Sequence, residues 1–306
     1  MSPAKKYSEI FIKGFLIGFT DIIPGISGGT MALILGIYDR IIKTIASLNT
    51  KWLIYVLTLR LKKSAEVLDY SLLIPLAAGI LSGVLFFTNV VPLPLFIKEF
   101  TLEVFSFFFG LILHTIYSIS KDNFRCSIIS FIFIAGGFSL GFSLLLFGQV
   151  TLPDSFIIIF VTGVLSATAM ILPGISGALI LILLGKYSTI FTAIGNLDFT
   201  ILLPFICGLI TAVLVTTKII AIILKDYSIH CFNFINGILI SSLIVLWPFQ
   251  KRQTDKDSQI NLESFHTPPD SIDTLIAVSL VTTGFLLISC LKRLASEKLQ
   301  NGNQNY

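Results

Sequence analysis

The residues best suited to chemistry in this sequence occur in two copies of one short motif. The first copy supplies Pro24, Gly25, Ser27, Gly28, Gly29 and Thr30, and the second supplies Pro173, Gly174, Ser176 and Gly177. A helix that begins at such a serine presents unpaired backbone N–H groups and the positive end of its dipole, glycine lets a ligand approach the backbone, and the hydroxyls add donors. We therefore predict two anion-binding helix starts. The alternative is that Pro-Gly and Ser provide only the turn and N-cap that any hairpin needs, although duplication in apolar surroundings favours the binding role.

A single acid, Asp21, lies three residues before Pro24 in an apolar stretch, and the second copy has Met170 at the matching place. An acid at bilayer depth costs on the order of 3 kcal/mol on insertion scales, so a functional role is the default. Asp21 is the candidate site for a coupling H⁺ or Na⁺, and no other cofactor is expected. The alternative is structural, in which Asp21 pairs with Lys13 or caps a half-helix.

Composition identifies the protein as an integral membrane protein. Hydrophobic residues make up 55% of the 306 residues, charged residues make up 12%, and the mean hydropathy is +0.92. A soluble protein of this length could not bury so much apolar surface. The four cysteines are scattered without metal-ligand spacing, so we predict neither a metal site nor a catalytic site.

Six stretches are long and apolar enough to cross a bilayer, and the two motif regions differ from them. The expected spans are residues 72–91, 102–118, 127–147, 201–224, 232–249 and 272–291. The apolar stretch before Pro24 is too short and too polar to cross, so both motif regions, residues 10–38 and 155–187, are predicted to be re-entrant hairpins. This arrangement places all but five of the 21 lysines and arginines on the cytoplasmic side, as the positive-inside rule prefers.

The predicted fold is therefore an all-α polytopic membrane protein made of two repeats, residues 1–150 and 151–306. Each repeat holds one hairpin and three spans, an odd number, so the second repeat is inverted relative to the first, as in many secondary transporters. Residues 52–63 are predicted to form an interfacial helix along the inner leaflet. Tyr38 and Tyr187, which end the motifs, are expected to be interfacial anchors.

The motif regions closely resemble the polyprenyl-phosphate (undecaprenyl-phosphate) transporter family, over residues 14–38 and 169–187. The resemblance implies flipping of undecaprenyl phosphate, the lipid carrier of cell-wall precursors, from the outer to the cytoplasmic leaflet of the bacterial plasma membrane for reuse. It also implies that the phosphate headgroup is held by Ser27, Gly28, Gly29, Thr30, Ser176 and Gly177 at the hairpin tips. The expected partners are this lipid and membrane lipids, with no nucleic acid, and both termini are expected in the cytoplasm.

Two other functions remain open at this point. Membrane undecaprenyl-pyrophosphate phosphatases also have inverted repeats and a Pro-Gly-x-Ser motif, but their chemistry needs an arginine beside the serine and paired glutamates. Here Gly28 and Gly177 follow the serines, and the nearest acid is Asp21, so we do not expect an enzyme. A secondary transporter of a small soluble anion is the third option.

Overall fold

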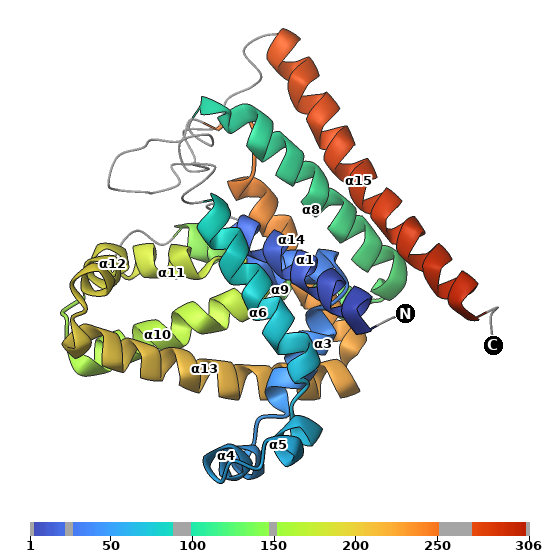
Figure 1. The fold of residues 1–306 in the computed structure, drawn as a ribbon. Helices are drawn as coiled ribbons and strands as arrows, with labels where there is room; N and C mark the ends of the chain where they lie inside the picture. The colour runs from blue at the N-terminus through green and yellow to red at the C-terminus, as the bar shows by residue number, and fades with distance from the viewer. Residues whose placement is uncertain (1–2, 22–26, 88–98, 147–151, 251–270, 304–306) are drawn as a thin grey trace. The chain divides into compact units, whose positions relative to one another are not determined.

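A computed structural model describes residues 3–21, 27–87, 99–146, 152–250 and 271–303, and the regular elements in these ranges are helices (Figure 1). The chain divides into two compact units: unit 1 comprises Met1–Pro94 with Ser143–Cys231, and unit 2 comprises Leu95–Phe142 with Phe232–Tyr306. Each unit therefore combines segments from both halves of the sequence. The division into repeats at residue 150 describes a pattern in the sequence and stays a prediction.

Unit 1 contains the two motif regions and the helices that pack around them. Its helices are α1 (Pro3–Asp21), α2 (Gly28–Ile34), α3 (Tyr38–Ala46), α4 (Thr50–Leu57), α5 (Leu61–Val67), α6 (Tyr70–Leu85), α10 (Phe156–Ile171), α11 (Gly177–Leu183), α12 (Tyr187–Asn196) and α13 (Phe199–Asp226). Unit 2 contains α8 (Thr101–Asn123) and α15 (Ser271–Asn303) with most of α9 (Ile128–Leu146) and α14 (Ser228–Val245).

The helices have the length and composition of a multi-pass membrane protein. Within the described ranges four are long and apolar enough to span a membrane, namely α8, α13, α14 and the Ser271–Cys290 part of α15. These candidate spans lie where four of the six spans were expected. The other two expected spans correspond to α6, which passes the same test only together with α5 across an 85° bend, and to α9, whose apolar stretch of Ile128–Leu144 is shorter.

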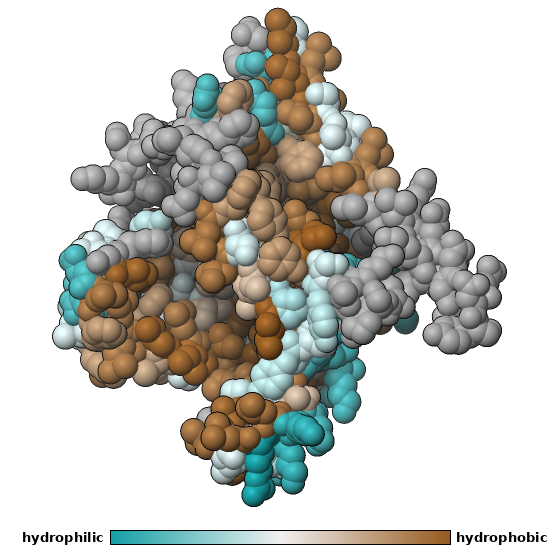
Figure 2. Space-filling view, viewed as in Figure 1, coloured by the Kyte–Doolittle hydropathy of each residue, from teal (hydrophilic) through white to brown (hydrophobic). Residues whose placement is uncertain are grey.

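Large hydrophobic side chains face outward, which suits contact with lipid. Ile128 is 78% exposed, Ile157 is 72% exposed and Phe199 is 68% exposed. Hydrophobic residues also dominate the face of the molecule drawn in Figure 2. An aqueous environment would penalise this surface, whereas a bilayer does not.

Glycines bring the helices of unit 1 into close backbone contact in two matching pairs. A Cβ added to Gly79 of α6 would lie 2.1 Å from the carbonyl oxygen of Phe11 on α1, and one added to Gly208 of α13 would lie 2.1 Å from the carbonyl oxygen of Phe160 on α10. Phe11 and Phe160 hold the same place in the two sequence copies. The duplication therefore extends from the sequence to the packing, with α1 on α6 repeated as α10 on α13.

Unit 2 also contains two matching glycine contacts, but each of them joins helices from different halves of the chain. A Cβ on Gly110 of α8 would lie 2.1 Å from the Val281 oxygen of α15, and a Cβ on Gly237 of α14 would lie 2.0 Å from the Ile134 oxygen of α9. Each pair joins one helix from the first half of the chain to one from the second. Unit 2 is therefore built from helices of both halves packed against one another.

The helix expected over residues 52–63 is instead two helices, α4 and α5. Thr58 and Leu59 end α4, because the backbone of Leu59 adopts a left-handed conformation with φ of 56°. Asn49 caps the start of α4 by accepting a hydrogen bond from the Trp52 N–H at 2.9 Å. The prediction of one continuous helix was therefore wrong, and the segment is a short pair of helices.

Candidate anion-binding site at the paired hairpins

Both predicted helix starts are present in unit 1, directly after the motif serines. Ser27 is the N-cap of α2, with extended backbone at φ −109° and ψ 136°, and Ser176 is the N-cap of α11, with φ −93° and ψ 130°. The extended serine backbone turns the chain into each helix and leaves the first N–H groups pointing out of the helix start. Pro24 and Gly25, predicted as turn residues of the first hairpin, lie outside the described residues. Pro173 and Gly174 do form the turn between α10 and α11, where Gly174 has a φ of 93°.

The backbone N–H groups at the start of α2 already donate hydrogen bonds to side chains of the protein. The Gly28 N–H donates to the Asp21 carboxylate at 2.7 Å, and the Gly29 N–H donates to the Ser27 hydroxyl oxygen at 3.2 Å. A Cβ on Gly28 would lie 2.5 Å from the carboxylate oxygen, so only glycine admits this contact without a shift. Asp21 thus caps the start of α2 in this structure, as its structural alternative expects, and its role in ion coupling stays a prediction. Its pairing with Lys13 was wrong, since Lys13 forms an ion pair with Glu9 at 3.1 Å.

The start of α11 has a different chemistry. Met170 takes the place of Asp21, and a Cβ on Gly177 would lie 2.4 Å from the Met170 Cγ atom. Ser176 makes no side-chain cap hydrogen bond, whereas Ser27 does. The Gly177 carbonyl instead accepts a hydrogen bond from the Ser166 hydroxyl at 3.0 Å. The second helix start therefore carries neither the carboxylate nor the serine cap that closes the first.

The two hairpins meet at their tips. The Gly174 N–H in the turn of the second hairpin donates to the Thr30 hydroxyl oxygen in α2 at 2.7 Å. Gly29 faces the carboxyl end of α10, since a Cβ there would lie 2.9 Å from the Met170 carbonyl oxygen. Ala178, the counterpart of Gly29 in the second copy, is exposed. This difference explains why only the first copy needs a second glycine after its serine.

Tyr38 belongs to the same meeting point, which the sequence did not indicate. Its side chain is 3% exposed, and its hydroxyl donates to the Ile171 carbonyl oxygen at the end of α10 at 3.2 Å. The expectation of an interfacial anchor at Tyr38 was therefore wrong. Tyr187, in contrast, is 41% exposed. The only sequence signal was the Gly-x-Tyr ending shared by both copies, and it does not distinguish the two tyrosines.

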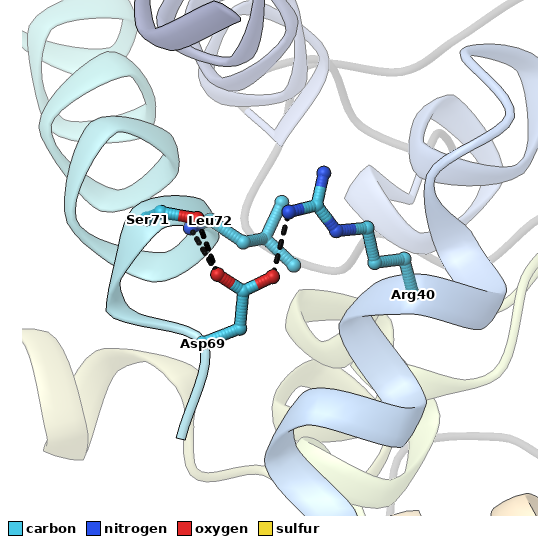
Figure 3. Close-up of polar contacts among 4 residues, drawn as sticks. All are labelled: Arg40, Asp69, Ser71 and Leu72. Atoms are coloured by element: carbon cyan, nitrogen blue, oxygen red, sulfur yellow. Dashed lines mark hydrogen bonds and ion pairs between the residues drawn. The ribbon is translucent and has the colours of Figure 1, made fainter. Parts of the chain in front are cut away.

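An ion pair at the base of the first hairpin joins α3 to α6 (Figure 3). The Arg40 guanidinium lies 2.6 Å from the Asp69 carboxylate, which also accepts hydrogen bonds from the Ser71 hydroxyl at 2.5 Å and the Leu72 N–H at 3.2 Å. Burial alone would raise the pKa of Asp69, but the hydrogen bonds from Ser71 and Arg40 and the charge of Arg40 outweigh it and hold the pKa below its usual value. Asp69 is therefore ionised throughout the physiological range.

The second hairpin has an ion pair of its own. Lys186, the N-cap residue of α12, is 3% exposed and bonds to the Asp154 carboxylate and the Leu152 carbonyl oxygen. A lysine is buried at so little exposure only when its charge is paired and its donors are satisfied. Lys186 thus fixes the segment before α10 to the end of the second hairpin.

The groups at the hairpin tips are of the kinds that contact anions in other proteins. The described part of the chain contains no group of three or more His, Cys, Asp or Glu side chains that could hold a metal ion. The groups at the two helix starts and their meeting point are backbone N–H groups, the hydroxyls of serine, threonine and tyrosine side chains, and one carboxylate. Such groups recognise a negatively charged headgroup by hydrogen bonding and by the helix dipole.

The fold and the paired hairpins define an all-α multi-pass membrane protein with a polar meeting point of two helix starts. The chain belongs to the VCA0040-like family, described as undecaprenyl phosphate translocase-like, whose family model matches residues 17–263. It is 27% identical over 273 residues to a polyprenyl-phosphate transporter of Vibrio cholerae, covering 88% of each chain. It is 29% identical over 255 residues to a polyprenyl-phosphate transporter of Staphylococcus aureus, covering 78% of this chain and 85% of the relative. No solved structure gives a significant match.

Proposed function

We propose that this protein carries a polyprenyl phosphate, in particular undecaprenyl phosphate, across the plasma membrane from the outer to the cytoplasmic leaflet. The observation that carries the proposal is the contact between the two hairpin tips through Thr30 and Gly174, made within one compact unit of a chain that belongs to this family. The relatives are named as transporters of this class of lipid. The lipid carrier would thereby return for another round of envelope synthesis.

The phosphate headgroup sits between the hairpin tips, held by Ser27, Gly28, Gly29 and Thr30 on one side and by Ser176 and Gly177 on the other. In the described conformation the Gly28 N–H is bonded to Asp21, so a phosphate oxygen replaces this carboxylate when the lipid binds. When Asp21 leaves the Gly28 N–H, its departure also removes a repulsive charge from the site. The start of α11 lacks such a carboxylate and receives the headgroup first.

The repeats are inverted, and the protein works by alternating access. The matching glycine contacts of α1 on α6 and of α10 on α13 support this proposal, because both hairpins rest on equivalent scaffolds. Two equivalent scaffolds of opposite orientation give an inward-open and an outward-open state of similar energy. The prenyl tail stays in lipid along the exposed apolar helices while the headgroup crosses. Both termini lie on the cytoplasmic side.

Asp21 couples transport to a proton or sodium gradient in this proposal. A carboxylate that leaves the Gly28 N–H needs a new partner, and a proton or a sodium ion is the simplest one. Transport that is insensitive to both gradients would remove this part of the proposal without affecting the remainder.

Reconstitution into vesicles with labelled polyprenyl phosphate tests the function. Wild type is expected to move the lipid between leaflets, and Ser27→Ala and Ser176→Ala are expected to slow it by about tenfold each, since each removes a hydrogen bond to a charged group. Ser127→Ala, outside the hairpins, is the control. Absence of lipid movement by the wild-type protein in every ion gradient would refute the proposal.

Two further assays separate the alternatives. Release of inorganic phosphate from a polyprenyl pyrophosphate would establish the phosphatase instead. Uptake of free phosphate that is not inhibited by polyprenyl phosphate would establish a carrier of a small soluble anion.

A further inference from the structure

The α4–α5 helix pair is present in only one of the two sequence copies. Gly14 and Gly163 lie 149 residues apart, whereas the matching Gly79 and Gly208 lie 129 residues apart, so the first half carries 20 additional residues between these glycines. In the second half α12 is followed almost directly by α13 (Figure 1). Because α13 packs on α10 as α6 packs on α1, the scaffold forms without the additional residues. The α4–α5 pair is therefore an addition to the scaffold, and packing of the scaffold helices does not account for it.

The surface of this pair combines exposed leucine and isoleucine side chains with basic ones. Leu59 is 81% exposed and Leu57 is 73% exposed, far more than a soluble protein surface normally presents side by side. The remaining members are Ile54 and Leu61 among the apolar residues, and Lys51, Arg60, Lys62 and Lys63 among the basic ones, all exposed. Glu66 is the only acid of residues 50–67. In Figure 2 hydrophobic and hydrophilic surfaces lie next to each other where α4 and α5 are drawn in Figure 1.

The left-handed backbone at Leu59 does not require a leucine side chain. The Arg60 N–H donates to the Tyr55 carbonyl and the Leu59 N–H to the Val56 carbonyl, which is the hydrogen-bond pattern that ends a helix with a left-handed residue. The same pattern ends α2 and α11, and there the left-handed residues are Gly36 and Gly185. A leucine at this position strains the backbone that a glycine would relax. Despite this strain, Leu59 projects an apolar side chain from the turn between α4 and α5.

The pair is held in place by side-chain contacts to α6. The Trp52 indole N–H donates to the Tyr70 hydroxyl at 2.9 Å, and this hydroxyl donates to the Ser64 hydroxyl oxygen at 3.3 Å. The ion pair of Arg40 and Asp69 joins the helices on either side of the α4–α5 pair, α3 and α6 (Figure 3). The exposed surface is thus preorganised, which reduces the entropy lost when it binds a partner.

We propose that the α4–α5 pair docks on the anionic lipid surface of the membrane in which the protein is embedded. The leucines and Ile54 enter the boundary between headgroups and acyl chains, and the four basic side chains contact lipid phosphates. Both halves of this recognition are needed for stable interfacial binding, since apolar burial and attraction to anionic lipids add. The inference depends only on the membrane location of the chain, so it holds or fails independently of the transported substrate.

Hydrogen–deuterium exchange of the full chain in nanodiscs tests the docking. Nanodiscs of phosphatidylcholine alone are compared with nanodiscs that also contain phosphatidylglycerol, and exchange is measured across residues 50–67. Wild type is expected to exchange more slowly with phosphatidylglycerol, and the protection falls by about fivefold for each basic side chain changed to glutamine. Leu59→Gly is expected to keep the turn, which glycine favours, and yet to lose protection.

The chain offers a matched control for Leu59. Leu197 ends α12 in the same left-handed conformation, with φ of 53°, and is 67% exposed, but it lies outside the basic cluster. Leu197→Gly is expected to leave the exchange of residues 50–67 unchanged. Equal exchange in the two lipid compositions, or protection that persists after all four basic residues become glutamine, would overturn the proposal. So would protection of this segment that requires added soluble protein.

A deletion checks that the pair is separable from the scaffold. Removal of Asn49 to Leu68 joins Leu48 to Asp69, just as Leu197 joins Asp198 in the second half. The deletion variant is expected to keep slow exchange in α1 and α6 and to lose every difference between the two lipid compositions. Rapid exchange throughout α1 and α6 would make the pair a structural part of unit 1 and would overturn the proposal.

Discussion

The two hairpins share a sequence and a scaffold, yet they close their helix starts in different ways. In the first hairpin Asp21 accepts from the Gly28 N–H at 2.7 Å, and the Ser27 oxygen accepts from the next N–H. In the second hairpin Met170 stands in the place of the acid, and Ser176 makes no side-chain cap. The two hairpins thus share equivalent helix contacts, and they differ in the carboxylate that only the first one has.

A helix start in a membrane protein is thus not automatically vacant for a ligand. A buried N–H group needs a partner, and the nearest one is often an oxygen of the same chain. In the function that we propose, a substrate anion binds at the first hairpin by exchange with that oxygen. The start of the second hairpin has no side-chain cap from its serine.

The largest effect is expected from substitutions in the matching glycine contacts of α6 on α1 and of α13 on α10. Gly79→Ala and Gly208→Ala each place a Cβ 2.1 Å from a backbone carbonyl oxygen, so each is expected to lower the free energy of unfolding by about 2–4 kcal/mol. The measurement is denaturant unfolding in detergent micelles. Gly136→Ala is the control, because its Cβ would meet only the Phe234 ring at 3.8 Å. Equal stability of all three variants would contradict the close packing of α6 and α13.

The next effect concerns the acid that distinguishes the hairpins. Asp21→Ala removes the cap of α2 and is expected to lower the free energy of unfolding by about 1–2 kcal/mol, whereas Met170→Leu at the matching place is expected to change it little. The same two variants are also assayed for lipid transport with and without ion gradients, and only the Asp21 variant is expected to change the response to a gradient. Equal loss in both variants would show that the carboxylate has no special role.

A smaller effect concerns the contact that joins the tips. Thr30→Val has nearly the same shape but leaves the Gly174 N–H without its acceptor, so it is expected to destabilise unit 1 by about 1–2 kcal/mol. Thr30→Ser retains the hydroxyl and serves as the control. The readout is hydrogen exchange of the Gly174 amide, which should become faster in the valine variant alone. Unchanged exchange in Thr30→Val would mean that the tips do not depend on this bond.

The smallest effect concerns the ion pair at the base of the first hairpin. Because the pKa of Asp69 is lowered in the folded protein, the ion pair adds stability above the ordinary carboxyl pKa of about 4, and this stability is lost as the pH falls through the lowered value. Arg40→Gln is expected to cost at most about 1 kcal/mol at neutral pH, since both side chains are more than a third exposed. Unfolding of wild type and variant should converge in strong acid. A constant difference at every pH would show that Arg40 acts by packing.

Much of the fold was predictable because it depends on local composition. Apolar runs of about 20 residues must form helices in lipid, where every backbone group needs an internal partner. The helix starts at Ser27 and Ser176 followed from the motif for the same reason. The α4–α5 break did not follow, because a leucine in a left-handed turn carries no sequence signal that distinguishes it from a leucine within a helix.

The amino-acid sequence alone was enough to identify a helical membrane protein with an internal duplication, two Pro-Gly-Ile-Ser-Gly helix starts and one acid beside the first. The contacts of each of these residues became known only from the packing of the helices. Thr30 meets a residue 144 positions away and Tyr38 one 133 positions away, and α8 pairs with α15 from the opposite half. Such contacts depend on how whole helices pack through their glycines, and the spacing of residues along one segment does not encode that packing.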